Sequence, residues 1–227
     1  MAKILFVMTG ADHWTLNDGT AYPTGYWAEE FVAPFTVFTS AGHEVVVATP
    51  GGVVPTVDRN SLTPAMAGGE QTAADLTAAI EAADELRRPI ALADARLADY
   101  AAVFYPGGHG PMEDLASDPV SGALLVETLN SGKPLALVCH AVAAILAAGD
   151  AFTGYRVTGF TNEEEAAGGL ASKAPWLVET ELVKLGLDFE KVDPFQPFTV
   201  TDRTLHTGQN PASSGPLAEE VVKLVTG

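Results

Sequence analysis

The segment Lys133–Ala148 constrains the fold of this 227-residue chain more than any other. Its first part, Pro134–Val138, is a continuous apolar run too short for a helix, which predicts a strand buried on both faces of a parallel sheet. A segment rich in Ala, Val, Ile and Leu, with helical composition, follows at once. Cys139 and His140 are therefore predicted to lie on a tight strand-to-helix turn, the geometry of a nucleophile elbow.

Cys139 is the sole cysteine of the chain. The N-terminus of a helix carries a partial positive charge, and such a charge lowers the pKa of a nearby thiol, so the turn predicts an activated cysteine. The alternative is a small buried hydrophobic residue, because free cysteines are most often that. The Cys-His pair between a strand and a helix favours the reactive interpretation.

Short apolar runs alternate with helical segments along the rest of the chain. We expect strands at Ile4–Thr9, His43–Ala48 and Ala101–Tyr105, a hairpin over Phe198–Thr207, and helices at Tyr26–Ala41, Thr72–Arg88, Pro119–Asn130 and Trp176–Leu185. The alternation predicts one α/β domain over residues 1–227: a three-layer sandwich with a mostly parallel central sheet, of the flavodoxin-like type. Residues 49–90 interrupt the alternation, and we interpret them as an insertion that shapes or covers a site.

The carboxyl ends of parallel strands meet at one rim of the sheet, where ligands bind in such folds. The predicted strand ending at Tyr105 leads into Gly107, Gly108 and His109. Glycines there let the backbone approach a ligand closely, and one amide is placed to stabilise a developing oxyanion. A glycine-rich turn is a weak signal alone, and a histidine within it more often stabilises the loop than takes part in catalysis.

Composition excludes several function classes. The net charge of −17 argues against nucleic acid as a partner, because phosphates need a basic surface. One cysteine excludes an internal disulfide framework and suits a reducing compartment. No segment approaches the roughly 20 apolar residues that cross a bilayer, and the N-terminal apolar run fits a first strand better than a secretion signal. We expect a cytoplasmic protein without membrane contact.

Five groups of residues, spread over nearly the whole chain, carry a resemblance to a known family. They are Thr24-Gly25 with Glu30 and Pro34-Phe35, Gly107-Gly108-His109-Gly110, Cys139-His140, Thr158-Gly159-Phe160-Thr161 with the acids that follow, and Thr207-Gly208 with Asn210-Pro211-Ala212-Ser213. The chain resembles the ThiJ/PfpI superfamily, whose sheet is similar to that of class I glutamine amidotransferase domains. More narrowly, it resembles the heat-shock chaperone branch with glutathione-independent glyoxalase III activity.

The resemblance implies a role for each matching residue. The nucleophile falls on Cys139, its partner on His140 and the acid after the first strand on Glu30. The third member of the triad falls on Glu165, with Glu164 as the second choice. The implied oxyanion donors are the amides of Gly108 and His140, and Gly107 and His109 are expected beside the substrate. The resemblance also implies a homodimer, and the chemistry that it implies requires no cofactor and no metal. The metal-binding His/Glu set of the large bacterial chaperone relatives finds no match among the five histidines of this chain.

The implied activity converts methylglyoxal or a related 2-oxoaldehyde into a 2-hydroxy acid. The cysteine would add to the aldehyde as a hemithioacetal, and the enzyme would be a lyase of the D-lactate dehydratase class. Two other classes stay open on the sequence. One is a cysteine peptidase or amidase that uses the same residues, and the other is a stress-response chaperone or redox sensor with little turnover.

Overall fold

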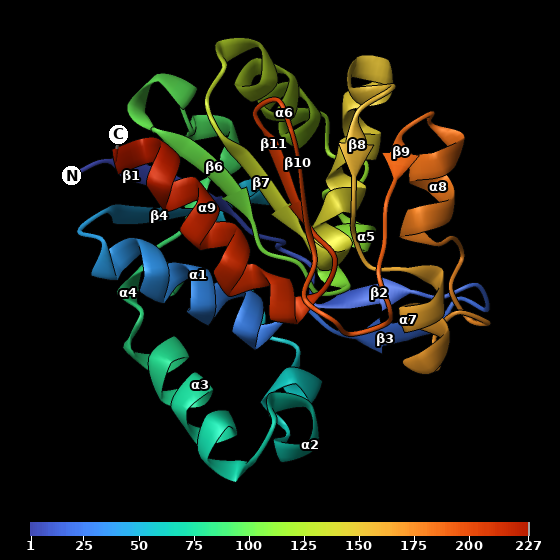
Figure 1. The fold of residues 1–227 in the computed structure, drawn as a ribbon. Helices are drawn as coiled ribbons and strands as arrows, with labels where there is room; N and C mark the ends of the chain where they lie inside the picture. The colour runs from blue at the N-terminus through green and yellow to red at the C-terminus, as the bar shows by residue number, and fades with distance from the viewer. Residues whose placement is uncertain (227) are drawn as a thin grey trace.

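The computed structural model describes residues 1–226 and contains a central seven-stranded sheet (Figure 1). The strand order is β10-β11-β7-β6-β1-β4-β5, and every neighbouring pair is parallel except β10 with β11. The strands are β1 (Lys3–Val7), β4 (Glu44–Thr49), β5 (Ile90–Ala91), β6 (Ala102–Tyr105), β7 (Leu135–Val138), β10 (Thr199–Asp202) and β11 (Leu205–Gly208). The predicted α/β class with a mostly parallel sheet is confirmed.

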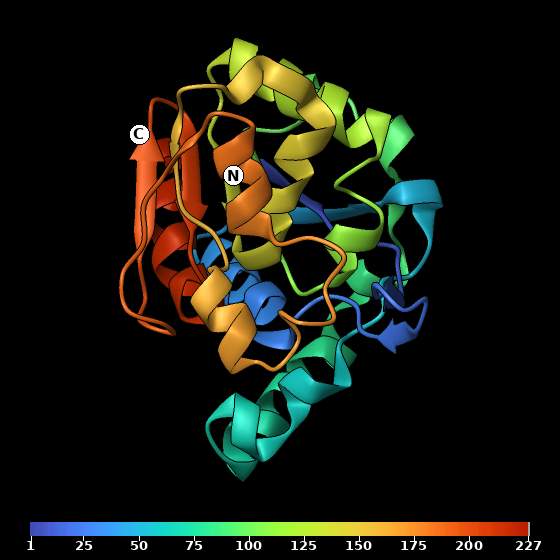
Figure 2. The same cartoon turned by 90° about the vertical axis from the view of Figure 1, so that its right-hand side faces the viewer.

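Side chains of the central strands alternate between two apolar cores, one on each face of the sheet. In β1, Ile4 and Phe6 join a cluster with Phe31 of helix α1 (Ala28–Ser40) and Leu217 of α9 (Ser214–Thr226). Leu5 and Val7 of β1 belong to the cluster on the opposite face. This second core is closed by α6 (Pro119–Ser131), α8 (Val178–Lys184) and the 3-10 helix η5 (Cys139–Phe152). The result is a three-layer sandwich (Figures 1 and 2).

Several predicted helices are shorter or more broken in the structure. The expected helix Thr72–Arg88 is two helices, α3 (Glu70–Ala82) and α4 (Asp84–Arg87), separated at Ala83. The helix that follows the elbow cysteine is a 3-10 helix, and Gly149 interrupts it with a φ of 63°. Alanine-rich composition predicts a helix but does not decide its hydrogen-bonding pattern, which tertiary packing sets.

Two short two-stranded sheets lie outside the main sheet. The hairpin β2 (His13–Thr15) with β3 (Ala21–Pro23) lies in a segment that reads as a polar loop. A further short strand, β8 (Arg156–Val157), pairs with β9 (Asp188–Phe189) in a separate sheet. The remaining short helices are η1 (Pro50–Gly52), η2 (Arg59–Leu62), α2 (Pro64–Ala67), η3 (Leu92–Asp94), η4 (Leu97–Asp99), α5 (Gly110–Glu113), α7 (Asn162–Ala167) and η6 (Pro211–Ser213).

The segment 49–90 makes contact with the first long helix and extends away from the sheet. Figures 1 and 2 show α2 and α3 protruding from the sandwich beyond α1. The Ser61 hydroxyl of η2 accepts a hydrogen bond of 3.0 Å from the amide of Ala28, the first residue of α1. Because Trp27 provides no side-chain cap, this serine caps the helix in its place. None of the helices among residues 1–226 is long and apolar enough to cross a bilayer.

Candidate active site

Cys139 lies directly after β7 in a strained backbone conformation. Its φ is 58°, in the left-handed region that non-glycine residues rarely adopt. Only 3% of the residue is exposed, and its side chain lines a cavity rather than being sealed in the core. Strained residues of this kind concentrate at functional sites, where the surrounding structure holds them in place. The turn therefore has the elbow geometry that the adjacency of strand, cysteine and helix predicted.

His140 connects the sulfur of Cys139 to Glu165, a residue of α7. Its Nδ1 lies 3.3 Å from Sγ, and its Nε2 lies 2.6 Å from Oε2 of Glu165. Burial, reinforced by the charge of His109, lowers the pKa of His140 to about 4. The pKa of Glu165 is also lowered, because the attraction of His140 and the hydrogen bonds from both imidazoles outweigh burial. A neutral His140 thus donates from Nε2 to the carboxylate and presents the Nδ1 lone pair to the thiol.

Glu30 approaches the sulfur from α1 and is fully buried. Its Oε2 accepts a hydrogen bond of 2.8 Å from the amide of Gly107. Its Oε1 has no oxygen or nitrogen partner in the described part of the chain, and this carboxyl interacts instead with Cys139. Burial raises the pKa of Glu30 to about 8, so that the carboxyl is mostly protonated at pH 7.

The thiol of Cys139 is not activated in the resting site, which contradicts the sequence prediction. Burial raises its pKa well above the ordinary value, and the neighbouring Glu30 raises it further. The prediction considered only the positive end of the following helix, whose effect is small beside the loss of solvation. The sulfur therefore needs a base at the moment of reaction, and the lone pair of His140 Nδ1 lies 3.3 Å from it.

The acids Glu164 and Glu165 are neighbours in sequence but have different partners. Glu165 binds His140, whereas Oε1 of Glu164 accepts hydrogen bonds from the Phe195 amide at 2.8 Å and the Asn210 side chain at 2.8 Å. Glu164 is also the third residue of the capping box at the start of α7. Glu165, the first choice of the sequence analysis for the triad acid, therefore contacts the histidine. Glu164, the second choice, instead forms hydrogen bonds that hold neighbouring segments together.

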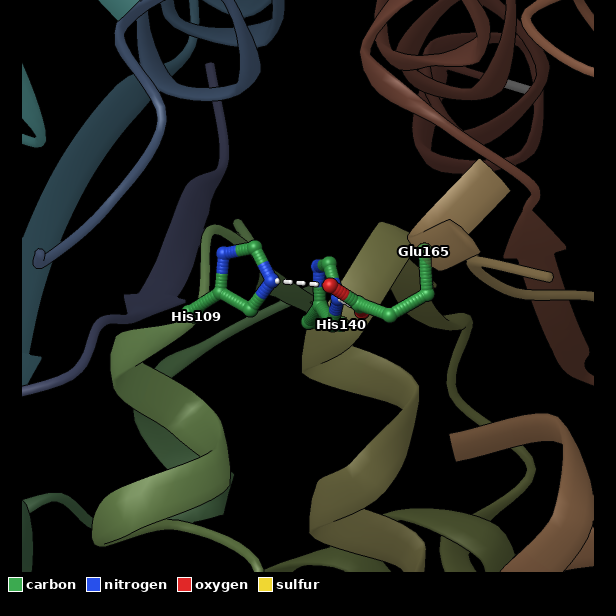
Figure 3. Close-up of side chains that lie close together, drawn as sticks. All are labelled: His109, His140 and Glu165. Atoms are coloured by element: carbon green, nitrogen blue, oxygen red, sulfur yellow. Dashed lines mark hydrogen bonds and ion pairs between the residues drawn. The ribbon is translucent and has the colours of Figure 1, made fainter. Parts of the chain in front are cut away.

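His109 has a more central position than its glycine-rich loop suggests. Its Nε2 lies 2.9 Å from Oε1 of Glu165, the oxygen that His140 does not use (Figure 3). Its ring stacks on Trp14 with centroids 5.2 Å apart and lies 3.9 Å from the ring of His140. One carboxylate therefore holds two imidazoles. The ligand-type atoms of the three residues lie within 4.8 Å of one another, so this set is able to hold a metal ion.

The two glycines after β6 allow the backbone to approach the elbow closely. A Cβ atom on Gly108, whose φ is 97°, would lie 2.4 Å from the carbonyl oxygen of Gly25. The amide of Gly107 is engaged by Glu30 and is not free to bind a substrate oxygen. The Gly108 amide, in contrast, has no hydrogen-bond partner within residues 1–226. Of the two glycines, only Gly108 keeps the expected capacity to donate to an oxyanion.

Two adjoining cavities open above Cys139. The inner one has a volume of about 200 Å³ and is lined by Cys139 and His140, and the outer one has about 610 Å³ and reaches Glu165. Both are lined by Trp27, Met66, His109, Phe160 and Phe195.

The sequence analysis assigned no site role to Trp27, Met66 or Phe195. Met66 belongs to α2, so the 49–90 segment does contribute to the site walls. Phe195 has a φ of 62°, a conformation that its sequence does not signal. Asn210 and the two residues after it also line the inner cavity, and here the resemblance had already marked the segment.

Comparisons with known proteins place this arrangement in a family. The protein/nucleic acid deglycase HchA of Staphylococcus aureus is 28% identical over 236 residues, which cover 97% of this chain and 78% of that protein. The structure of glyoxalase III from Candida albicans matches with a TM-score of 0.83 at 25% identity, over 98% of this chain and 96% of that one. Rapid Encystment Protein 24 kDa of Francisella tularensis shares the fold, with a TM-score of 0.85 at 23% identity over 99% of both chains. The model of the DJ-1/PfpI family matches residues 23–224, and the chain belongs to this family.

Proposed function

We propose that this protein is a glutathione-independent glyoxalase III-type enzyme, which converts methylglyoxal or a related 2-oxoaldehyde into a 2-hydroxy acid. One observation carries the proposal: the sulfur of Cys139 lies between a neutral imidazole and a buried carboxyl whose pKa is raised to about 8. Such a pair supplies a base for thiol addition and a second group for proton transfer on the adduct. The likeness to the glyoxalase III structure from Candida albicans supports the same activity.

The first step is addition of the thiol to the aldehyde. The Nδ1 atom of His140, 3.3 Å from Sγ, takes the thiol proton as the carbon–sulfur bond forms. Glu165 keeps the ring oriented and stabilises the positive charge that the ring then carries. The amide of Gly108 stabilises the negative charge that develops on the aldehyde oxygen. His140 then returns the thiol proton to this oxygen, which becomes the hydroxyl of a hemithioacetal, and the imidazole is neutral again.

The second step moves a proton from C1 to C2 of the adduct. Ionised Glu30 removes the C1 proton, giving an enediolate, and returns this proton to C2. The proton of the C1 hydroxyl moves to the C2 oxygen, so that C1 becomes the carbonyl of a thioester on Cys139 and C2 carries the new hydroxyl. At pH 7 this carboxyl is mostly protonated, so that only a minority of molecules hold the active base. Water activated by His140 then hydrolyses the thioester, releasing the 2-hydroxy acid and the free thiol.

The dimensions of the site favour a small substrate over a polypeptide. The cysteine lies in a cavity of about 200 Å³, whose walls include the side chains of Trp27 and Phe160. A peptidase or amidase would use the same thiol and imidazole but would have to admit a longer chain to them. We propose a free small aldehyde as the substrate, and a homodimer in the cytoplasm as the working form.

The test compares lactate formation from methylglyoxal by the wild type and three variants. Cys139→Ala and Glu30→Gln are expected to lose at least about 100-fold in kcat/KM, because each removes a group that takes part in a chemical step. Glu81→Gln, on the exposed side of α3, is the matched control and is expected to retain wild-type activity. If the wild type forms no lactate, the proposal fails, and hydrolysis or redox sensing by Cys139 becomes the better hypothesis.

A further inference from the structure

We propose that His109, His140 and Glu165 also form a Zn²⁺ site, and that occupancy of this site reversibly switches off Cys139. The inhibitory part rests on the proposed function, whereas the binding part does not. The three side chains are held together before any ion arrives, since the carboxylate already contacts both imidazoles at 2.6 and 2.9 Å (Figure 3). A prearranged set loses little side-chain freedom on binding.

The donor atoms suit zinc rather than magnesium or calcium. Two imidazole nitrogens and one carboxylate oxygen are the ligands of many open zinc sites, whereas hard cations prefer oxygen ligands alone. All three atoms lie within 4.8 Å of one another, a spacing that small shifts of side chains convert to coordination distances. Other transition ions with the same ligand preference are expected to bind as well.

Access and charge both favour a cation at this position. The inner cavity reaches His109 and His140, and the outer cavity reaches His109 and Glu165, so an ion can enter from either. The charged residues that line the two cavities besides Glu165 are Glu29 and Asp58, both acidic. The net charge of the chain, −17, adds a negative potential that raises the local concentration of cations.

Ligation changes the tautomer of the catalytic imidazole. In the resting site His140 donates its Nε2 proton to Glu165, so a metal ion can bind Nε2 only after that proton has moved to Nδ1. The same shift occurs in His109. The two hydrogen bonds to the carboxylate are replaced by two zinc–nitrogen bonds and one zinc–oxygen bond, with no electron transferred and with the Nε2 protons relocated to Nδ1 of each ring.

The consequence for the thiol follows from the position of Nδ1. This atom is 3.3 Å from Sγ of Cys139, and once protonated it can no longer accept the thiol proton. A thiol must give up its proton to add to an aldehyde, and with Nδ1 protonated the imidazole beside it can no longer take that proton. Zinc at this site therefore inhibits without touching the sulfur.

A competing zinc site would use the sulfur itself, since thiolates are strong zinc ligands. In that case the ion would bind Sγ of Cys139 with Nδ1 of His140, and His109 would have no part in it. The two sites share only the imidazole of His140. Variants of Cys139 and His109 therefore distinguish them.

The experiment titrates metal-stripped protein with Zn²⁺ by isothermal titration calorimetry and with Co²⁺ by absorption spectroscopy. We expect one ion per chain and visible cobalt bands without a sulfur-to-cobalt charge-transfer band. Cys139→Ser is expected to retain the affinity within about 3-fold, whereas His109→Asn is expected to weaken it by at least about 10-fold. Thermal unfolding checks that each variant is folded, and His109→Gln serves as a second variant at that position.

In parallel, lactate formation by the wild type is expected to fall at least about 10-fold at saturating Zn²⁺ and to recover with a chelator. Absence of binding overturns the proposal, as does binding that Cys139→Ser abolishes or that both His109 variants leave unchanged. Binding at the expected residues with unaltered turnover overturns the inhibitory part. A wild type that binds zinc in the expected way but lacks turnover on methylglyoxal contradicts the proposed function and leaves the metal site standing.

Discussion

Burial of the Glu30 carboxyl affects both the reaction and the stability of the fold, and the two effects have opposite dependences on pH. Its pKa of about 8 means that the reactive ionised form accumulates only at mildly alkaline pH. We expect kcat/KM for methylglyoxal to rise about tenfold per pH unit below this value and to level off above it. Initial rates between pH 5.5 and 9.5 check this, and a flat profile would contradict a base role for Glu30.

The same residue makes the folded state less stable as pH rises. An unfolded chain ionises Glu30 near its ordinary pKa of 4.5, whereas the folded chain keeps it protonated up to about pH 8. The unfolded state thus binds fewer protons in this window, and the free energy of unfolding falls as pH increases through it. Relative to the wild type, Glu30→Gln is expected to gain roughly 2–4 kcal/mol between pH 5 and pH 8. Urea denaturation at both pH values measures the difference; an equal difference at the two would show that Glu30 does not titrate there.

The two neighbouring acids of α7 offer a matched pair of substitutions. Glu165→Gln replaces the carboxylate that orients and balances His140, so kcat is expected to fall about 100-fold or more while the fold persists. Glu164→Gln replaces a buried carboxylate that binds Phe195 and Asn210, and it is expected to cost about 1–3 kcal/mol of stability.

Steady-state kinetics and thermal unfolding of both variants test this assignment. A larger loss of kcat in folded Glu164→Gln than in Glu165→Gln would reverse the roles.

At the scale of elements, the site depends on segments that lie outside the central sheet. Helix α2 contributes Met66 and the segment before β10 contributes Phe195, and both residues line the inner and the outer cavity. The backbone amide of Phe195 is anchored to Glu164, which holds the residue in its positive-φ conformation. These segments rather than the sheet are expected to set the size of the substrate.

Shortening the side chain of Phe195, which lines both cavities, should enlarge the space available to a substrate. Phe195→Ala is expected to raise kcat/KM for phenylglyoxal relative to methylglyoxal by about 10-fold, because removing an apolar wall is worth about 1–3 kcal/mol of discrimination. Phe195→Leu, which keeps most of the wall, serves as the control and should change the ratio less. An unchanged ratio in folded Phe195→Ala would show that this side chain does not limit the substrate.

The sequence predicted elements and residues whose signals are local. The buried strands follow from apolar runs, and the elbow follows from a strand and a helix with Cys139 and His140 between them. No local sequence pattern marks the residues that line the cavities. Met66 and Phe195 are far apart in sequence, and each is a single exposed apolar residue. The raised pKa of Cys139 was also out of reach, because it depends on how much protein covers the sulfur.

At the scale of the whole molecule, the charge of −17 limits the partners of this chain. Although similar proteins are named protein/nucleic acid deglycase, we expect no measurable affinity for duplex DNA at physiological salt, because the chain offers few cations to replace counterions. Fluorescence anisotropy with a labelled duplex tests this, with a basic DNA-binding protein as the positive control. A dissociation constant below about 10 μM would contradict the expectation.

The chain is also expected to form a homodimer in solution, as its resemblance implied. Sedimentation equilibrium should then give twice the chain mass of 23.6 kDa at micromolar concentration. A mass equal to that of one chain over the accessible concentration range would contradict a stable dimer.

Because Cys139 is the sole cysteine and lines the inner cavity, every thiol in a pure sample reports on that cavity. A reagent that counts accessible sulfhydryl groups in the folded protein therefore counts the molecules whose cavity is open. Protection from a small alkylating agent reports occupancy of the cavity by any compound, whether or not that compound is turned over.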